Sequence, residues 1–253
     1  QRQMCIRDRL KPQRVATYTR PDASHAYQVA VTVCDHVPCV AVLCMEGENT
    51  ALWTQCGSET SYQLLDGQGP WRLVSVPNST SFALHDHRGD VTLFSPTLKP
   101  TPLDPLLSFC PTLHILPAEH EGTWQAIGLT SDGRLLAPHR VLAKDATSFT
   151  CTDHLLIWTT HAHEAMFVPL TCLTTTPQVS QLSRRVERGS RIVTAVPSAM
   201  SLVLQMPRGN LETTYPRPMV LDVIRDRLDR LAFGEALRVS RAHRPPDILE
   251  RLA

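Results

Sequence analysis

GSRIVTAVPSAMSLVLQMPRGNLETTYPRPMVLDVIR, residues 189–225, contains the change of pattern that decides the fold. Two short apolar runs come first, at 192–196 and 201–205, and a polar, turn-rich segment follows at 207–212. Beyond Pro218 the apolar residues recur at helical spacing. The hydrophobic period therefore changes from about 2 to about 3.6. This change predicts a junction between a β-domain and an α-domain.

The chain upstream of this junction has the pattern of an all-β fold. Residues 26–206 contain about fourteen short apolar runs separated by turn signals, at spacings near the 8–12 residues typical of β-domains. A sandwich usually needs about seven to nine strands, so this number favours repeated four-stranded blades. Two Asp–Gly turns, at 86–89 and 132–133, recur loosely between strands. We therefore predict a partial β-propeller of three to four blades over residues 11–206.

The chain downstream of the junction is predicted to be helical. Pro218 fits the first turn of a helix, where a missing N–H costs nothing. The apolar residues on one face of this helix are Val220, Leu221, Ile224, Leu228 and Leu231. A second short helix is predicted over 233–241, which makes an αα-hairpin, the unit of helical solenoids. The predicted fold class is mainly β with an α tail. Residues 217–253 form the start of an α-solenoid, and residues 1–10 fit no element and are expected to be artefactual or disordered.

The composition gives little sign of a charged ligand and none of a membrane. The net charge is +1, with 25 Lys and Arg against 24 Asp and Glu. The basic residues concentrate after residue 180, where they fit an acidic partner, RNA or a solvated helix face. No apolar run approaches the roughly 18 residues that a membrane helix needs. The eight cysteines lie mostly in apolar runs, which predicts reduced, buried thiols and a cytoplasmic protein, with the nucleus as a further location.

The sequence offers no set of residues that predicts catalysis or a cofactor. It contains no nucleophile elbow, no phosphate-binding glycine loop and no Walker motif. Cysteines 34, 39 and 44 are too widely spaced for a typical zinc site. The histidine pairs 85/87 and 161/163 can each face one side of an extended segment, but neither has a third ligand nearby. We therefore expect a non-enzymatic chain without metal or cofactor.

Two segments remain as candidate functional sites. The densest basic cluster consists of Arg184, Arg185, Arg188 and Arg191. It lacks interleaved aromatic residues, so it does not predict a stacking platform for single-stranded RNA. It is either a partner or phosphate contact or a solvated loop.

The second candidate is a structural junction over 207–216, centred on Pro207, Arg208, Gly209, Asn210, Leu211 and Glu212. Gly209 and Asn210 are expected to take positive φ at a tight turn. Leu211 is expected to anchor the turn, so that the turn and the 220–228 helix face dock the first helix on the last blade.

The run LQMPRGNLE, followed by a Tyr-Pro-Arg helix start, resembles the Elongator complex protein 1 (IKAP) family, the largest subunit of Elongator. The run TSFTCTDHLLIWTTHAHEAMFVPL at 147–170 is similar to a hairpin of the same family. The likeness is firmest over residues 147–244. Pro218 departs from the family pattern, which usually has an ordinary helix former after the arginine matched by Arg217.

The resemblance implies a fragment at the end of a WD-repeat-like second propeller and the start of a helical solenoid. It implies a non-catalytic scaffold that holds other Elongator subunits, including the catalytic radical-SAM and acetyl-CoA-dependent subunit. That complex modifies the wobble uridine of tRNA, so contact with tRNA would be indirect. Two other readings remain open. One is a propeller–solenoid subunit of a vesicle-coat complex, and the other is a propeller hydrolase.

Overall fold

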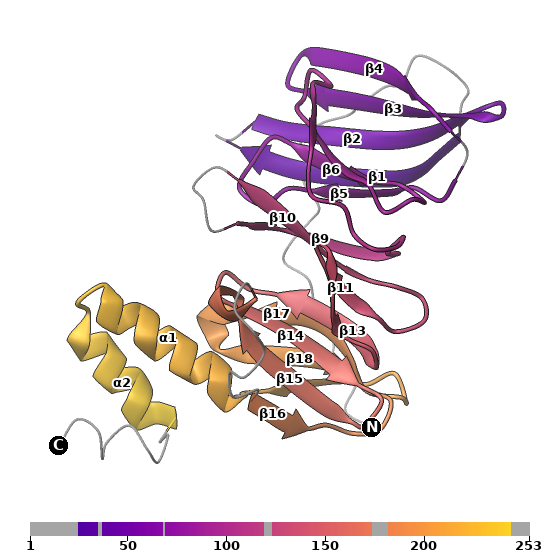
Figure 1. The fold of residues 1–253 in the computed structure, drawn as a ribbon. Coiled ribbons are helices and arrows are strands. Elements are labelled where there is room, and N and C mark those ends of the chain that lie inside the picture. The colour runs from indigo at the N-terminus through magenta and orange to yellow at the C-terminus, as the bar shows by residue number, and fades with distance from the viewer. Residues whose placement is uncertain (1–24, 35–36, 68, 119–122, 174–181, 244–253) are drawn as a thin grey trace, which may run out of the picture.

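The computed structural model describes residues 25–34, 37–67, 69–118, 123–173 and 182–243. These residues form five antiparallel sheets in chain order, followed by two helices (Figure 1). Within each sheet, every strand pairs with its neighbour in the sequence. Such meanders, placed one after another, are the blades of a propeller.

The strand bounds are as follows. The first sheet contains β1 (His25–Cys34), β2 (Val37–Glu46), β3 (Asn49–Cys56) and β4 (Glu59–Leu65). The second contains β5 (Arg72–Ser75), β6 (Phe82–His85), β7 (Val91–Phe94) and β8 (Pro100–Pro102). The third contains β9 (Thr112–Pro117), β10 (Trp124–Leu129), β11 (Leu135–Ala137) and β12 (Arg140–Ala143). The fourth contains β13 (Ala146–Cys151), β14 (Leu155–Thr160), β15 (Glu164–Pro169) and β16 (Leu182–Arg185). The last contains β17 (Arg191–Val196), β18 (Ser201–Gln205) and β19 (Leu211–Thr214).

The predicted fold class, mainly β with an α tail, is confirmed. The predicted number of blades, three to four, was too low, because the described residues form five sheets. Four of these sheets have four strands and one has three. Residues 1–10, expected to be artefactual or disordered, lie outside the described residues. The sheet region also continues past residue 206, because β19 pairs with β18 as far as Thr214.

The core lies between the sheets and is divided into clusters that each join two neighbours. Phe82 and Leu84 of the second sheet pack with Leu43 and Leu52 of the first, for example. Equivalent clusters join the second sheet to the third, the third to the fourth and the fourth to the last. None of these clusters, drawn from the described part of the chain, joins the first sheet to the last. The sheets therefore form an open stack.

Tight turns of the predicted Asp–Gly type connect strands within the sheets. The Asp86 carboxylate accepts hydrogen bonds from the backbone N–H groups of Arg88 and Asp90, both at 2.9 Å. Gly89 follows with a φ of +103° and Gly133 has a φ of +86°, values that favour glycine. The recurring turn motif seen in the sequence is therefore present at both positions.

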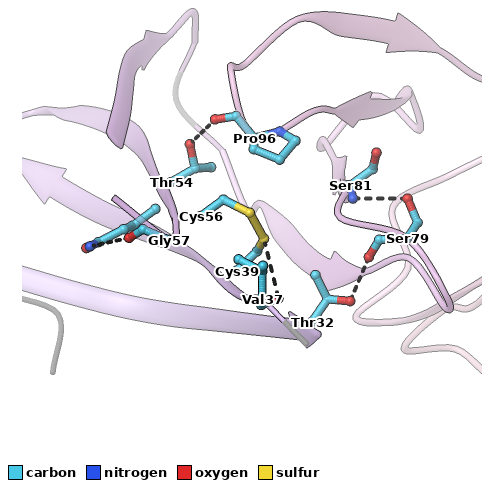
Figure 2. Close-up of a disulfide and its surroundings, with 10 residues drawn as sticks. Thr32, Val37, Cys39, Thr54, Cys56, Gly57, Ser79, Ser81 and Pro96 are labelled. Atoms are coloured by element: carbon cyan, nitrogen blue, oxygen red, sulfur yellow. Dashed lines mark hydrogen bonds between the residues drawn. A yellow bond between two sulfur atoms is a disulfide. The ribbon is translucent and has the colours of Figure 1, made fainter. Parts of the chain in front are cut away.

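Polar side chains tie the first sheet to the second (Figure 2). The Thr54 hydroxyl donates to the Pro96 carbonyl oxygen at 2.7 Å, and the Thr32 hydroxyl donates to that of Ser79 at 2.7 Å. Both hydroxyls are buried, so each would cost free energy if left without a partner. These bonds therefore help to fix the position of the first sheet relative to the second.

One pair of cysteines corrects the expectation of reduced thiols. Cys39 on β2 and Cys56 on β3 are joined by a disulfide, as Figure 2 shows. The β2–β3 register places the two residues directly opposite each other, with Cα atoms 4.1 Å apart. Their separation of seventeen positions hid this proximity in the sequence. Cys44 and Cys110 are buried and form no disulfide, as expected.

The two helices follow the last sheet directly. Helix α1 runs over Arg217–Asp229 and α2 over Phe233–His243, which confirms the predicted αα-hairpin. Pro218 lies in the first turn of α1, so its missing N–H breaks no helical bond. Val220 and Ile224 of α1 pack against Ala236 of α2, and Met200, which precedes β18, joins this cluster. No helix in the described ranges is long and apolar enough to cross a membrane.

Candidate functional site

The structure places the turn-rich segment inside the last sheet rather than between two domains. Residues 207–210 form the hairpin that connects β18 to β19, where Met206 N–H donates to the Asn210 carbonyl at 2.8 Å. Gly209 N–H in turn donates to the Met206 carbonyl at 2.8 Å. Gly209 has the expected positive φ, +84°, but Asn210 does not. Leu211 and Glu212 lie on β19.

The predicted anchoring role of Leu211 is wrong. Its side chain is 64% exposed on the edge strand β19, so it cannot hold the helices on the sheet. Met219 of α1 anchors the helices on the sheet instead. Its side chain is 2% exposed and packs with Leu202, Leu204 and Met206. On the predicted helix face, Leu221 is only partly buried and Leu231 is 72% exposed.

The four clustered arginines occupy two neighbouring segments. Arg184 and Arg185 end β16, whereas Arg188 lies in the connection to β17 and Arg191 begins β17. All four are exposed, and none forms an ion pair with another described residue. Two of them, Arg188 and Arg191, line a cavity of about 370 Å³.

This cavity brings together the arginine cluster and the 161/163 histidine pair, which no pattern in the sequence connects. Its other charged or titratable residues are Glu187 and the histidines 161 and 163, which lie in the turn from β14 to β15. Val186 N–H donates to the His163 carbonyl at 2.9 Å and fixes this turn against the β16–β17 connection. Arg184 and Arg185 do not line the cavity. Thr147, Thr160 and Ser190 also line it.

Several hydrogen bonds hold the backbone around the cavity. Ser190 Oγ donates to the Glu187 carbonyl at 2.7 Å, and Ile192 N–H donates to Ser148 Oγ at 2.8 Å. His161 N–H donates to the Asp145 carbonyl at 3.0 Å. Arg188 and Arg191 therefore extend from main-chain positions that are held by hydrogen bonds.

The arrangement does not provide a metal centre. Within the described ranges, no three side chains of His, Cys, Asp or Glu lie close enough together to hold a metal ion. The guanidinium groups and imidazoles of the cavity are suited to an oxyanion instead.

A smaller cavity of about 190 Å³ lies where α1 meets the fourth and last sheets. Asp153, His154 and Asp222 line it, together with Asp226 and Arg227 among others. Burial raises the pKa of the Asp222 carboxyl above its ordinary value. Asp226 is paired with Arg230 at 2.8 Å, the i,i+4 contact expected on a helix surface.

Comparison with known proteins assigns the propeller. Residues 14–193 match the family described as "ELP1 N-terminal second beta-propeller". The chain is 44% identical to Elongator complex protein 1 of Schizosaccharomyces pombe over 144 residues, which are 53% of this chain and 11% of that protein. It is 39% identical to the Saccharomyces cerevisiae protein of the same name over 146 residues, 52% of this chain and 11% of that protein. It is 41% identical to the Mus musculus protein of the same name over 125 residues, which cover 46% of this chain and 9% of that protein. The chain therefore belongs to the family of the ELP1 N-terminal second β-propeller.

Proposed function

We propose that this chain is part of a non-catalytic scaffold subunit of the Elongator complex, supporting modification of the wobble uridine of tRNA. The family match over residues 14–193 is the observation that supports this proposal most. Similarity to proteins named Elongator complex protein 1 from fungi and a mammal supports it further. The matched segments are a small part of those relatives. The role in tRNA modification is therefore proposed for the full-length protein that contains this chain.

The architecture suits a scaffold because the helices are held on a stack of sheets. Met219 inserts into the core shared by the fourth and last sheets, while Val220 and Ile224 hold α2 against α1. The direction of the helix pair is thereby set by the sheets. Phe233 and Leu237 of α2 are exposed, as expected for a solenoid unit whose apolar face is covered by a further unit.

The partners that we propose are the other Elongator subunits, including the catalytic radical-SAM and acetyltransferase subunit. Contact with tRNA is indirect in this proposal, and no membrane is involved. The site of action is the cytoplasm, with the nucleus as a further location. The chain itself carries no cofactor in this account and positions subunits that do the chemistry.

Loss of the gene tests the function directly. Mass spectrometry of tRNA nucleosides should show loss of the modified wobble uridine in cells without the protein, and its return when the wild-type gene is restored. A variant with a charge at Met219 should restore the modification less well than wild type. Unchanged wobble uridine in the deletion strain would contradict the proposal.

A further inference from the structure

We propose that the cavity lined by Arg188, Arg191, His161 and His163 binds a phosphorylated side chain on a segment of a partner protein. For brevity these four residues are called the basic pocket. The proposal stands on the charges and geometry of this pocket, and it does not depend on membership of any complex. It uses two motifs, the 161–163 histidine pair and the 184–191 arginine cluster, that the proposed scaffold role leaves unexplained.

The two arginines of the basic pocket are not held in ion pairs within the described part of the chain. Neither Arg188 nor Arg191 forms an ion pair there, and Glu187 lines the same cavity without pairing with them. Two guanidinium groups around one space match the charge of a phosphoryl group, about −1.5 to −2 at neutral pH. Arginine also offers paired N–H donors that bind phosphate in a bidentate manner. Arginine clusters are a recurring means of recognising phosphorylated motifs.

The pocket is held in place before any ligand arrives. The histidine turn is fixed by the bond from Val186 N–H to the His163 carbonyl at 2.9 Å and by His163 N–H to the Thr160 carbonyl at 3.1 Å. The opposite wall is fixed by the Ser190 hydroxyl, which bonds the Glu187 carbonyl. A space of about 370 Å³ admits a phosphorylated side chain together with the adjoining backbone. Preorganised walls reduce the ordering cost of binding.

A protein segment fits this surface better than RNA does. Binding along an RNA backbone requires positive charges that follow several successive phosphates. Here the charges gather at one cavity, Glu187 lies within it, and no Phe, Tyr or Trp lines it to serve as a platform for successive bases. Arg184 and Arg185 are adjacent on the exposed strand β16, so their side chains lie on opposite faces of the sheet and neither is part of the basic pocket.

The test measures binding of a fluorescent peptide with one phosphothreonine among acidic residues to the full-length protein, by anisotropy. The comparison probes are its unphosphorylated twin and a single-stranded RNA of similar length, all at one ionic strength. We expect saturable binding of the phosphopeptide, weaker binding of the twin and RNA, and competition by inorganic phosphate. The double substitution Arg188→Ala/Arg191→Ala should raise Kd by roughly tenfold or more, the effect of losing a charge-assisted hydrogen bond.

Two controls make the result specific. Arg238→Ala removes an exposed arginine of α2, far from the pocket in the sequence and absent from its lining, and should leave Kd unchanged. Arg188→Lys/Arg191→Lys keeps the charge but removes the bidentate donors, so its Kd should lie between those of wild type and the alanine variant. It also tests the proposal if the alanine variant does not fold. Equal binding of both peptides, tighter binding of RNA, or equal weakening by Arg238→Ala would overturn the proposal.

Discussion

His85 on β6 uses both ring nitrogens, one toward the segment that precedes β9 of the third sheet and one toward the turn that follows β6 in its own sheet. It is fully buried, accepts the Cys110 backbone N–H at Nε2 over 2.9 Å, and therefore donates from Nδ1 to the Asp90 carbonyl at 3.1 Å. Its ring stacks on Phe109. These contacts require the neutral imidazole, and burial lowers the pKa of His85 below its ordinary value. Burial also lowers the pKa of His114, with Arg72 adding to the effect.

This environment predicts a loss of stability in mild acid. Because the pKa is lower in the folded state, the unfolded chain takes up the proton first as the pH falls. The contribution of His85 is complete above the unfolded pKa of about 6.5 and declines below it, by up to about 1.4 kcal/mol per pH unit. Urea unfolding of the full-length protein between pH 8 and pH 5, followed by near-ultraviolet circular dichroism, measures this slope.

The slope should be shallower in His85→Gln, which has no proton to gain, although its stability at neutral pH is lower. His87→Gln alters an exposed histidine two positions away and should keep the wild-type slope. A slope that His85→Gln leaves unchanged would show that His85 does not titrate in this range.

Gly89 and Gly209 give a matched pair of turn glycines. Both have positive φ, +103° and +84°. A Cβ at Gly89 would lie 2.3 Å from the Leu106 carbonyl oxygen, whereas a Cβ at Gly209 would meet nothing within 4 Å. Gly209→Ala should therefore lower the free energy of unfolding only by the cost of backbone strain, about 1–2 kcal/mol. Gly89→Ala should cost clearly more in the same denaturation experiment, because main chain must also move. Equal costs would show that strain alone governs both turns.

Leu211 and Met219 show what sequence could not decide at the residue scale. Both are large apolar residues next to the predicted junction, and either could have docked the helices. Strand alternation does not say which face of an edge strand is covered, so the exposure of Leu211 was missed. The positive φ of Gly209 was predictable, because glycine in a polar turn between two strands has few other roles.

At the scale of elements, the fourteen apolar runs predicted over residues 26–206 match every strand except the last one of each sheet. These last strands are β4, β8, β12, β16 and β19, and each lies at a sheet edge. Most of their residues are exposed or only partly buried, and β16 is exposed throughout. β1, β5, β9 and others at the opposite edges contact neighbouring sheets and so carry apolar residues. Hydrophobic periodicity reveals a strand only when one face of the strand is buried. An exposed edge strand that contains Arg or Pro has no buried face, so its sequence does not show this pattern.

The helix pair gives a prediction about how it is held. Met219→Ala removes a side chain that is 2% exposed in the core shared with the fourth and last sheets. We expect a loss of about 2–5 kcal/mol, as for other buried large-to-small changes. Amide hydrogen exchange should speed up in α1 and α2 while the first sheet is unaffected.

Leu221→Ala is the matched control on the same helix. Leu221 is partly exposed and belongs to none of the apolar clusters of the described residues, so its truncation should change exchange little. A larger effect at Leu221 than at Met219 would restore the helix face expected from the sequence.

At the scale of the whole molecule, repetition was predictable and long-range proximity was not. Recurring strands and turns indicated blades, and the change of period after residue 206 indicated the helices. The basic pocket combines residues from 161 to 191, which meet because β14 and β15 pair in one sheet and β17 of the next sheet contacts β14. The Cys39–Cys56 disulfide likewise depends on the register of one hairpin.

The central claim is that this propeller and helix pair belong to a scaffold of Elongator. The most direct measurement is affinity purification of the tagged full-length protein from cells at natural expression, with partners identified by mass spectrometry. We expect recovery of the catalytic radical-SAM and acetyltransferase subunit, with less of it recovered by a variant carrying Met219→Asp. Recovery of vesicle-coat subunits without the Elongator catalytic subunit would show that the protein is not an Elongator scaffold.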